Sequence, residues 1–449
     1  MPRAWLAALL FTRATTQRTP VQRVYDALDS SVAFFPQITN AADAAQIIAE
    51  TLSHPFGLAV LNGRVFARDH AGIDKTYLRH LRLVLDAAAR HAVGNVVVAH
   101  DTNSDGCVTA CVGCTPGSDE RHLGVRAFPS TTVAKRGDAC GVLVPTAAAQ
   151  APARPTTVPY ARRQNKAFWR GRLVAPGDDS ALCVGNRARV EGLSLTLREP
   201  RLFDVKALSI SPAWGRNGSC LPLTYSRKLS RRLHRVTEAR RQSHYARYNY
   251  YARYKMLLHF PGDHRRWTTD AVILHWTHAG TAKHYFPGPG LTNGTTHLDV
   301  DIASAAAAAR AVLGDPTLSD RLRAGARAVA EDLTCPECVE KFLADALFKL
   351  RARHLQQTVL DDRHALRAAL RGASCSGLVE YVSRDAPING THQLRSVRSR
   401  FQKEYHAHAT AHRSTGVDRL VAPVPLPDAV APVGFDPACV ALVEAAFPT

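Results

Sequence analysis

Two segments of the chain end an apolar strand with glycine and place arginine close to it, a combination that could bind phosphate. Residues 166–171 end in Arg170 and Gly171, and residues 254–262 end in Gly262. Arginine presents a planar fork of donors that matches two phosphate oxygens, and glycine lets the backbone come close to a ligand. Two such turns facing one cleft would suit a nucleotide sugar.

The turn after Gly262 adds two adjacent cations, Arg265 and Arg266. A nucleotide diphosphate needs more than one cation to offset the desolvation of its paired negative charge. We therefore expect Arg265 or Arg266 to bind the diphosphate together with Arg170. The alternatives are a solvated basic loop for Arg265 and Arg266 and an ion pair with a carboxylate on a sheet edge for Arg170.

Asp101 stands at the end of an apolar strand over residues 96–99. A carboxylate there should open into a cleft between domains, where partial desolvation raises its basicity, so it could deprotonate an acceptor hydroxyl. The alternative is a turn or a helix cap, because Asn103, Ser104 and Asp105 are common turn formers.

The ten cysteines leave the redox compartment open. Four cysteines close together in the sequence could form a four-thiolate zinc site, and a separate pair forms a lone Cys-x-x-Cys motif. Neither group has the paired Cys-x-x-Cys spacing that is typical of zinc sites, and local disulfides are an alternative. Buried free thiols are the third alternative, and we expect no metal. These residues are Cys107, Cys111, Cys114 and Cys140, then Cys335 and Cys338.

The composition indicates two or three globular domains with an excess of positive charge. The chain has 449 residues, is 46% hydrophobic and carries a formal net charge of +19. Such a surface favours anionic partners such as nucleotides, nucleic acid or acidic glycans. Residues 227–255 hold ten Lys or Arg and five Tyr, which could bind nucleic acid. A basic amphipathic helix would have the same composition, and we do not favour nucleic acid.

The sequence leaves the compartment open. Three Asn-Gly-Ser/Thr sequons, at Asn217, Asn293 and Asn389, could be used only in a secretory lumen. The start, residues 1–11, has one positive charge and a short apolar stretch that could be a signal or an anchor. No later run approaches the roughly 20 apolar residues of a membrane-spanning helix, so we expect the body of the chain to cross no membrane.

Strands and helices alternate along the chain. Asn62-Gly63 inside the apolar run 58–67 predicts a tight hairpin, and Asp74 could cap a helix that leads to the strand ending at Asp101. Strand, helix and strand in that order favour a parallel sheet covered by helices. The second half predicts strands and helices in the same alternation: strands near Ala167, Met256 and Val272, and helices over 301–313, 318–333 and 338–354.

These blocks together resemble glycosyltransferase family 90, the Rumi-type protein O-glucosyltransferases and fungal capsule-associated xylosyltransferases. The resemblance covers about residues 55 to 355. It rests on the order of the matching segments: the Asn62-Gly63 hairpin, the strand ending in Asp101, Phe168-Trp169-Arg170-Gly171, Tyr254-Lys255 with Gly262, Tyr285-Phe286-Pro287, His297 and the helices through Leu350.

The resemblance implies an α/β fold of two Rossmann-like domains facing a cleft, the GT-B arrangement. It implies transfer of glucose or xylose from a UDP-sugar to a hydroxyl of a protein or glycan, with inversion and without metal or cofactor. Asp101 would be the base and Arg170 would hold the donor, while Trp169, Tyr254 and His297 would contact donor or acceptor. The family also implies a secretory lumen, with membrane contact only through an N-terminal anchor.

The chain departs from the family after Gly262, where the family usually has Ser-x-Arg. When the two are aligned on Trp267, Arg266 stands in place of the serine and Thr268 in place of the arginine. Thr295 replaces a tryptophan of the family. A relative that binds nucleotide or glycan without catalysis therefore stays open. The expected division is a possible signal, anchor or disordered start at 1–20, an acceptor-side domain at 21–150, a linker at 151–164, a donor domain at 165–355 and an extension of unknown role at 356–449.

Overall fold

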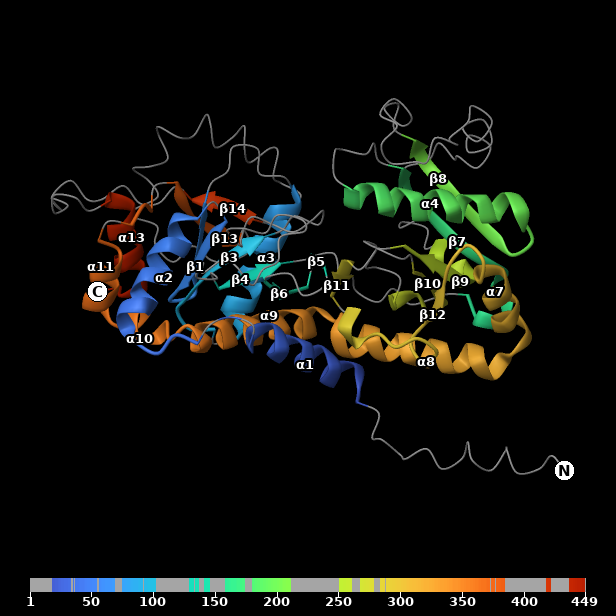
Figure 1. Cartoon of the computed structure of the whole chain (residues 1–449), viewed down its shortest axis with the longest axis horizontal. Coiled ribbons are helices and arrows are strands. Elements are labelled where there is room, and N and C mark those ends of the chain that lie inside the picture. Colours follow the sequence, from blue (N-terminus) through green and yellow to red (C-terminus); the bar gives the residue numbers. More distant parts are fainter. Residues whose placement is uncertain are drawn as a thin grey trace.

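The computed structural model describes the backbone of residues 18–33, 35, 37–54, 56–68, 75–91, 93–101, 129–132, 134–136, 141–145, 158–173, 180–210, 250–260, 267–277, 283–286, 288–371, 373–375, 377–383, 417–420 and 436–448. Their strands form two main sheets, each covered by helices, so the protein is a mixed α/β protein with two lobes (Figure 1). We call the part around the seven-stranded sheet the first lobe and the part around the five-stranded sheet the second lobe.

The sheet of the first lobe is mixed and has the order β14-β13-β2-β1-β3-β4-β6. Its first four neighbouring pairs are antiparallel, while β3-β4 and β4-β6 are parallel. The strands are β1 (Gly57–Leu61), β2 (Arg64–Arg68), β3 (Val96–Asp101), β4 (Ser130–Thr132), β6 (Val142–Leu143), β13 (Leu378–Ser383) and β14 (Val417–Leu420).

The predicted hairpin is confirmed. Asn62 and Gly63 connect β1 and β2, and both have positive φ, 49° and 74°. A two-residue turn of this kind matches the right-handed twist of the strands it joins. The helix after the hairpin, α3 (Lys75–Arg90), leads to β3, which is parallel to β2 but separated from it by β1. Strand, helix and strand therefore follow as predicted, but the strand between them makes this part of the sheet antiparallel.

The chain returns to the first lobe at its C-terminal end. β13 pairs with β2, and a disulfide joins Cys375 to Cys439. The helices that cover this lobe are α2 (Ala41–Ser53), α3, α10 (Gln357–Leu360), α11 (Arg363–Ala369) and α13 (Pro437–Ala446). No sequence motif predicted this return, which gives the segment after residue 356 a structural role.

The second lobe has an all-parallel sheet in the order β12-β10-β9-β7-β8. Strands were correctly predicted near Ala167, Met256 and Val272. The strands are β7 (Gln164–Leu173), β8 (Phe203–Ile210), β9 (Tyr254–His259), β10 (Val272–Trp276) and β12 (Leu298–Val300), accompanied by α4 (Ser180–Arg198), α7 (Ala305–Gly314), α8 (Pro316–Leu333) and short 3₁₀ turns η2 (Tyr160–Arg162), η3 (Tyr250–Arg253), η4 (Trp267–Thr269) and η5 (Gly288–Gly290).

The three helices predicted after residue 300 are confirmed as α7, α8 and α9 (Pro336–Arg353). Gly314 ends α7, and Asp315 caps α8 by accepting a hydrogen bond from the Leu318 amide, with Pro316 in the first turn. The Cys335 and Cys338 sulfurs form a disulfide at the start of α9. The other predicted cysteine group lies outside the described residues.

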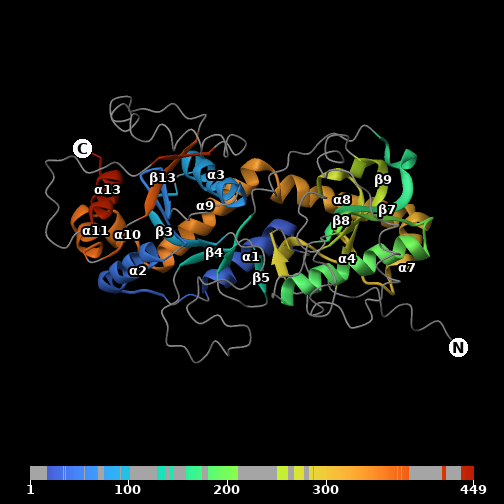
Figure 2. The same ribbon diagram turned by 90° about the horizontal axis from the view of Figure 1, so that it is seen from above.

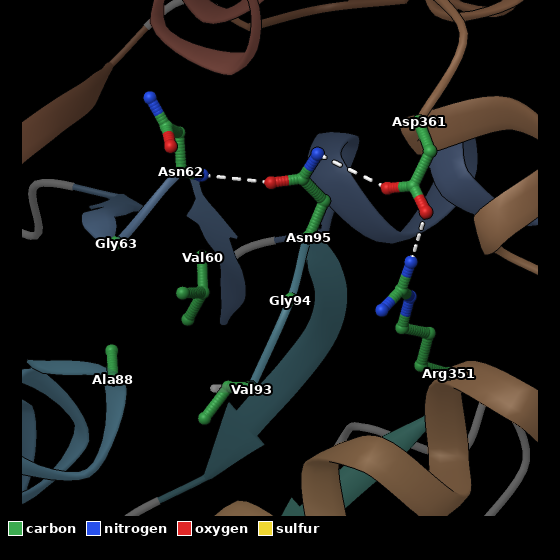
Figure 3. Close-up of a pocket in the computed structure, with 9 residues that line it drawn as sticks. All are labelled: Val60, Asn62, Gly63, Ala88, Val93, Gly94, Asn95, Arg351 and Asp361. Atoms are coloured by element: carbon green, nitrogen blue, oxygen red, sulfur yellow. Dashed lines mark hydrogen bonds and ion pairs between the residues drawn. The ribbon is translucent and has the colours of Figure 1, made fainter. Parts of the chain in front are cut away.

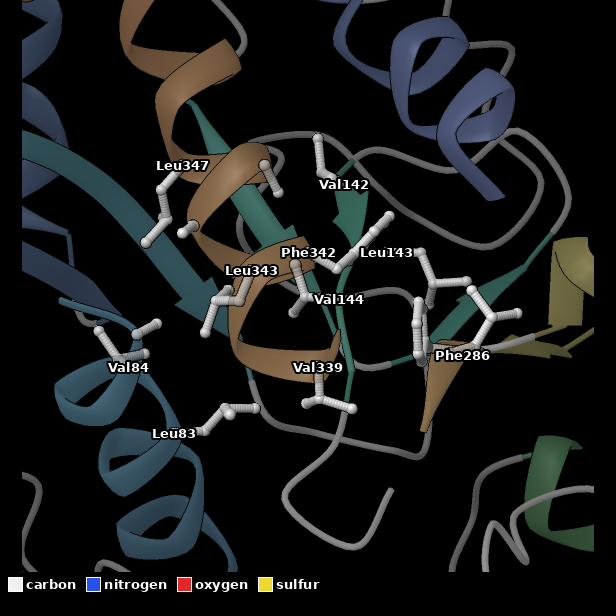
Figure 4. Close-up of a cluster of buried hydrophobic side chains, with 14 of the residues drawn as sticks. Leu83, Val84, Val142, Leu143, Val144, Phe286, Val339, Phe342, Leu343 and Leu347 are labelled. Atoms are coloured by element: carbon white, nitrogen blue, oxygen red, sulfur yellow. The ribbon is translucent and has the colours of Figure 1, made fainter. Parts of the chain in front are cut away.

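The two lobes share one hydrophobic core. α1 (Pro20–Ala33), α8 and α9 run along one side of both lobes (Figures 1 and 2). Phe286 of the second half packs on Phe342 of α9 with ring centroids 4.9 Å apart. Side chains of α3 and β6 belong to the same buried cluster (Figure 4). Continuous burial of this kind stabilises the lobes against each other.

A short ladder also joins the lobes. β5 (Ala134–Arg136), which follows β4, pairs with β11 (Lys283–Tyr285), which follows β10. Both strands lie between the lobes in Figure 1.

In the part of the chain that the structure describes, no helix combines the length and the apolar character needed to cross a membrane.

Candidate functional site

A row of polar rings lies at the carboxyl end of the five-stranded sheet. The register pairs His275 of β10 with His259 of β9 on one side and with Asp299 of β12 on the other. Neighbours in register point to the same face of a sheet, and His297, two residues before Asp299, shares that face. We call His259, His275, His297 and Asp299 the histidine cluster. Ligands of open α/β sheets bind at this end of the strands.

Three members of the cluster converge on one oxygen atom. Asp299 Oδ1 lies 3.1 Å from His275 Nδ1 and 3.0 Å from His297 Nε2. The two rings are nearly perpendicular, with centroids 5.0 Å apart. The ring of His259 stacks on His275 at 5.1 Å and fixes its orientation. The arrangement gathers two nitrogens and a carboxylate around one point.

The turn before β12 holds His297 and Asp299 in place. The Asn293 side-chain oxygen accepts a hydrogen bond of 3.0 Å from the Asp299 amide, and the Gly294 amide donates to the His297 carbonyl. Gly325 of α8 packs against this turn so closely that a Cβ there would lie 2.2 Å from the Thr295 carbonyl oxygen. The helix therefore requires glycine at this position to support the cluster.

The cluster is buried on one side and open on the other. The side chain of His297 is 5% exposed, against 27% for His275 and 35% for Asp299. The buried ring of Trp267 lies beneath, with its centroid 5.8 Å from that of His259 and 6.2 Å from that of His297. A ligand can reach Asp299 and His275 from solvent.

The environment keeps His297 neutral and Asp299 ionised. Burial lowers the pKa of His297 to about 4, and the charge of His275 acts in the same direction, while Asp299 opposes both effects. The hydrogen bond from His275 is the main reason that the pKa of Asp299 lies below its usual range. At neutral pH the cluster thus offers an uncharged imidazole and a carboxylate, which can hold a metal ion or transfer a proton.

Arg170 lies inside the second lobe. The sequence predicted that the strand would end at Arg170 and Gly171. Strand β7 instead continues to Leu173, with an irregular register after Gly171. The guanidinium lies 2.9 Å from Asp204 Oδ1, donates to the backbone oxygens of Trp169 and Asp204, and covers the Phe168 ring at 4.5 Å.

The Arg170 side chain is only 4% exposed. Asp204 lies on β8, at the edge of the sheet. The structure therefore favours the structural alternative, a pair between an arginine and a sheet-edge carboxylate.

Three further predicted residues belong to the same interior. The Tyr254 hydroxyl donates to Asp204 Oδ2 at 2.6 Å, so both carboxylate oxygens are engaged. Trp169 is buried against Phe260. The space beside Gly171 is filled by the Trp169 indole, which lies 2.2 Å from where a Cβ would be. Trp169, Gly171 and Tyr254 thus pack the lobe, and only His297 of the predicted contacts lies in the histidine cluster.

The backbone of Asp101 lies where the sequence predicted it, at the carboxyl end of β3. Asp101 is paired in register with Thr132 of β4, and Ala134, two residues later, is paired with Tyr285 of β11. Asp101 therefore stands at the edge of the first lobe that leads into the ladder between the lobes. Its side chain lies outside the described part of the structure, as do Gly262, Arg265 and Arg266.

A pocket of about 390 Å³ lies at the opposite end of β3, beside the hairpin turn (Figure 3). Asn95 spans it, accepting from the Asn62 amide and donating to Asp361, which also pairs with Arg351. These polar groups bond to each other, and the pocket is remote from the carboxyl ends of the strands. We therefore place the candidate site at the histidine cluster.

Sequence reasoning found His297 but missed His259, His275 and Asp299. Each lies in a short apolar strand, in the patterns Leu-His-Phe, Leu-His-Trp and His-Leu-Asp. A polar residue in such a run was a usable signal, but only the register aligns the three strands. Comparison with known proteins adds no assignment, since no family model and no curated protein matches the chain.

Proposed function

We propose that the protein is a glycosyltransferase that moves glucose or xylose from a UDP-sugar to a hydroxyl of a protein or glycan, with inversion. The observation that carries the proposal is the histidine cluster, a partly open set of polar groups at the carboxyl end of a parallel sheet. Asp101 stands at the edge of the first lobe, and the chain continues from there through β4 into the ladder of β5 and β11 that joins the two lobes. Two α/β lobes joined in this way support a GT-B arrangement of Rossmann-like domains.

In this proposal the second lobe binds the donor. The nucleotide sugar lies beyond the ends of β9, β10 and β12, near the histidine cluster, and Arg265 and Arg266 offset the charge that builds on the departing UDP. Asp101 of the first lobe removes the proton of the acceptor hydroxyl as the sugar-oxygen bond forms on the face opposite to the leaving diphosphate. Arg170 positions β7 against β8 and does not contact the donor.

The proposal is tested by thermal unfolding with UDP, UDP-glucose and UDP-xylose, compared with ADP and GDP. A ligand that binds only the folded state at about 100 times its Kd adds roughly 2.7 kcal/mol to the stability. We expect a rise in Tm with uridine nucleotides alone, reduced in Arg265→Ala and retained in Arg321→Ala, which removes an exposed charge from α8. No response to any nucleotide would contradict the proposal.

A protein that binds the nucleotide sugar without transferring it is the second candidate. The family resemblance implies that Arg170 binds the donor. The pairing of Arg170 with Asp204 favours the second candidate, because it keeps this arginine out of the donor site. Release of UDP from UDP-glucose or UDP-xylose separates the two candidates. The enzyme releases UDP at a rate that falls at least about tenfold in Asp101→Asn, and the binding protein releases none above the rate in buffer.

A further inference from the structure

The triad of His275, His297 and Asp299 has the composition of a metal site. Its potential ligand atoms all lie within 4.8 Å of one another, and the triad is the group of this kind found among the described residues. Two imidazoles with one carboxylate suit zinc, cobalt, iron or nickel, whereas magnesium and calcium prefer oxygen ligands alone.

We propose that His275 Nδ1, His297 Nε2 and Asp299 Oδ1 bind one divalent transition-metal ion of the zinc class. With metal-ligand bonds of roughly 2.0–2.2 Å, tetrahedral ligands lie about 3.3 Å apart. The distances from Asp299 Oδ1 to the two ring nitrogens, 3.1 and 3.0 Å, need to change by only a few tenths of an ångström. Three protein ligands leave the fourth position open to solvent or substrate.

The surroundings of the triad fit the proposal. Ligating histidines bond through their other nitrogen, and His297 Nδ1 lies 2.9 Å from the Thr296 hydroxyl. That hydroxyl lies 3.1 Å from the Thr292 carbonyl and can donate to it, so it can accept a hydrogen bond from Nδ1. On metal binding the proton of His297 moves from Nε2 to Nδ1, and the proton that His275 donates to Asp299 moves from Nδ1 to Nε2. The nitrogens freed in this way, His297 Nε2 and His275 Nδ1, give their lone pairs to the ion. Both imidazoles bind as neutral rings.

The position of the triad gives the ion an entry path. Asp299 and His275 are partly exposed while His297 anchors the site from the buried side. Under the proposed function the open position would take an oxygen of the donor diphosphate. Metal binding does not depend on that function, so each can fail alone. The family resemblance implied no metal, so this ion would be a property of this chain.

The test is titration of the chelator-treated full-length protein with Co²⁺, followed by visible absorption, with Zn²⁺ as competitor. We expect the wild-type protein to bind one more equivalent of Co²⁺ than either variant, Asp299→Asn or His297→Gln. Each variant should lose more than the roughly 10–100-fold in affinity that removal of an outer partner costs. His364→Ala, which removes an exposed histidine of α11, should bind like wild type.

Metal at other sites, such as the cysteines outside the described residues, appears equally in wild type and variants and cancels in the difference. Circular dichroism checks that each variant is folded, and Asp299→Asn keeps the shape of the side chain. Equal stoichiometry and affinity in wild type and both folded variants would overturn the proposal, as would a wild type without Co²⁺ absorption. A Zn²⁺-induced rise in Tm that is present in wild type and absent in Asp299→Asn would support it.

Discussion

Two polar clusters in the same parallel sheet differ in what their neighbours leave open. In the arginine cluster of Arg170, Asp204 and Tyr254, both carboxylate oxygens are engaged and the arginine is 4% exposed. In the histidine cluster two rings converge on one oxygen of Asp299, and 35% of that side chain is exposed. The comparison separates a charge that holds strands together from a set of groups that can receive a ligand.

The arginine cluster should be the more important for stability. Replacing Arg170 by Met leaves Asp204 without its buried cationic partner, and breaking such a pair costs about 3–5 kcal/mol. The matched control is Arg310→Met, because Arg310 and Glu199 form an exposed pair in the same lobe, worth less than about 1 kcal/mol. Urea unfolding measures both. If the Arg170→Met variant were as stable as wild type but no longer bound UDP, Arg170 would be a donor-binding residue and not a structural one.

The two clusters should also lose their contributions to the stability of the fold in different pH ranges. A histidine with a folded-state pKa near 4 binds protons more readily in the unfolded chain, so His297 stabilises the fold fully above pH 6.5 and loses this contribution as the pH falls toward 4. The loss is on the order of 3 kcal/mol. Buried His100, whose pKa is also lowered to about 4 by burial, acts in the same range.

Asp204 should respond only in stronger acid. Burial acts to raise its pKa, but the Tyr254 hydrogen bond and the Arg170 charge outweigh burial and hold the pKa below its usual range. The unfolding free energy of metal-free protein is measured from pH 7 to pH 3. His297→Gln should flatten the slope between pH 6.5 and 4, and an unchanged slope would argue against a buried neutral His297.

The support of the histidine cluster by α8 predicts a smaller effect. Gly325→Ala places a methyl group against the Thr295 carbonyl, and such overpacking costs about 1–3 kcal/mol. It should also weaken Co²⁺ binding, because the turn that carries His297 must shift. Gly314→Ala is the control, since nothing lies within 4 Å of a Cβ there. Equal Tm and equal Co²⁺ affinity in both variants would show that the close approach is unimportant.

The smallest stability change is expected for Asp299→Asn in metal-free protein. Its hydrogen bonds to the two imidazoles lie at a partly exposed carboxylate, so the loss should stay below about 1 kcal/mol by urea unfolding. With Zn²⁺ present the difference from wild type should grow, because only wild type gains stability from the ion. A large loss without metal would assign Asp299 the same structural role as Asp204.

Local sequence signals were enough to predict much of the fold. Asn62-Gly63 gave the hairpin, and Gly314 followed by Asp315 and Pro316 gave the break between α7 and α8, because turns and caps depend on a few adjacent residues. The return of β13 to β2 was not predictable in this way, since it pairs residues more than 300 positions apart.

The candidate site was harder to predict for the same reason. Arg170 was correctly placed on a strand, but its partner Asp204 stands on another strand. His259, His275 and Asp299 become neighbours only through the register of three strands. Pattern reasoning therefore found single residues such as His297, while their partners required the sheet.

The most direct test of a ligand site at the histidine cluster is X-ray diffraction from crystals grown with Co²⁺, measured on both sides of the cobalt absorption edge. We predict an anomalous peak bonded to His275, His297 and Asp299 in wild type, and no peak there in Asp299→Asn. Anomalous density at other positions alone, with the triad hydrogen-bonded and empty, would contradict the account.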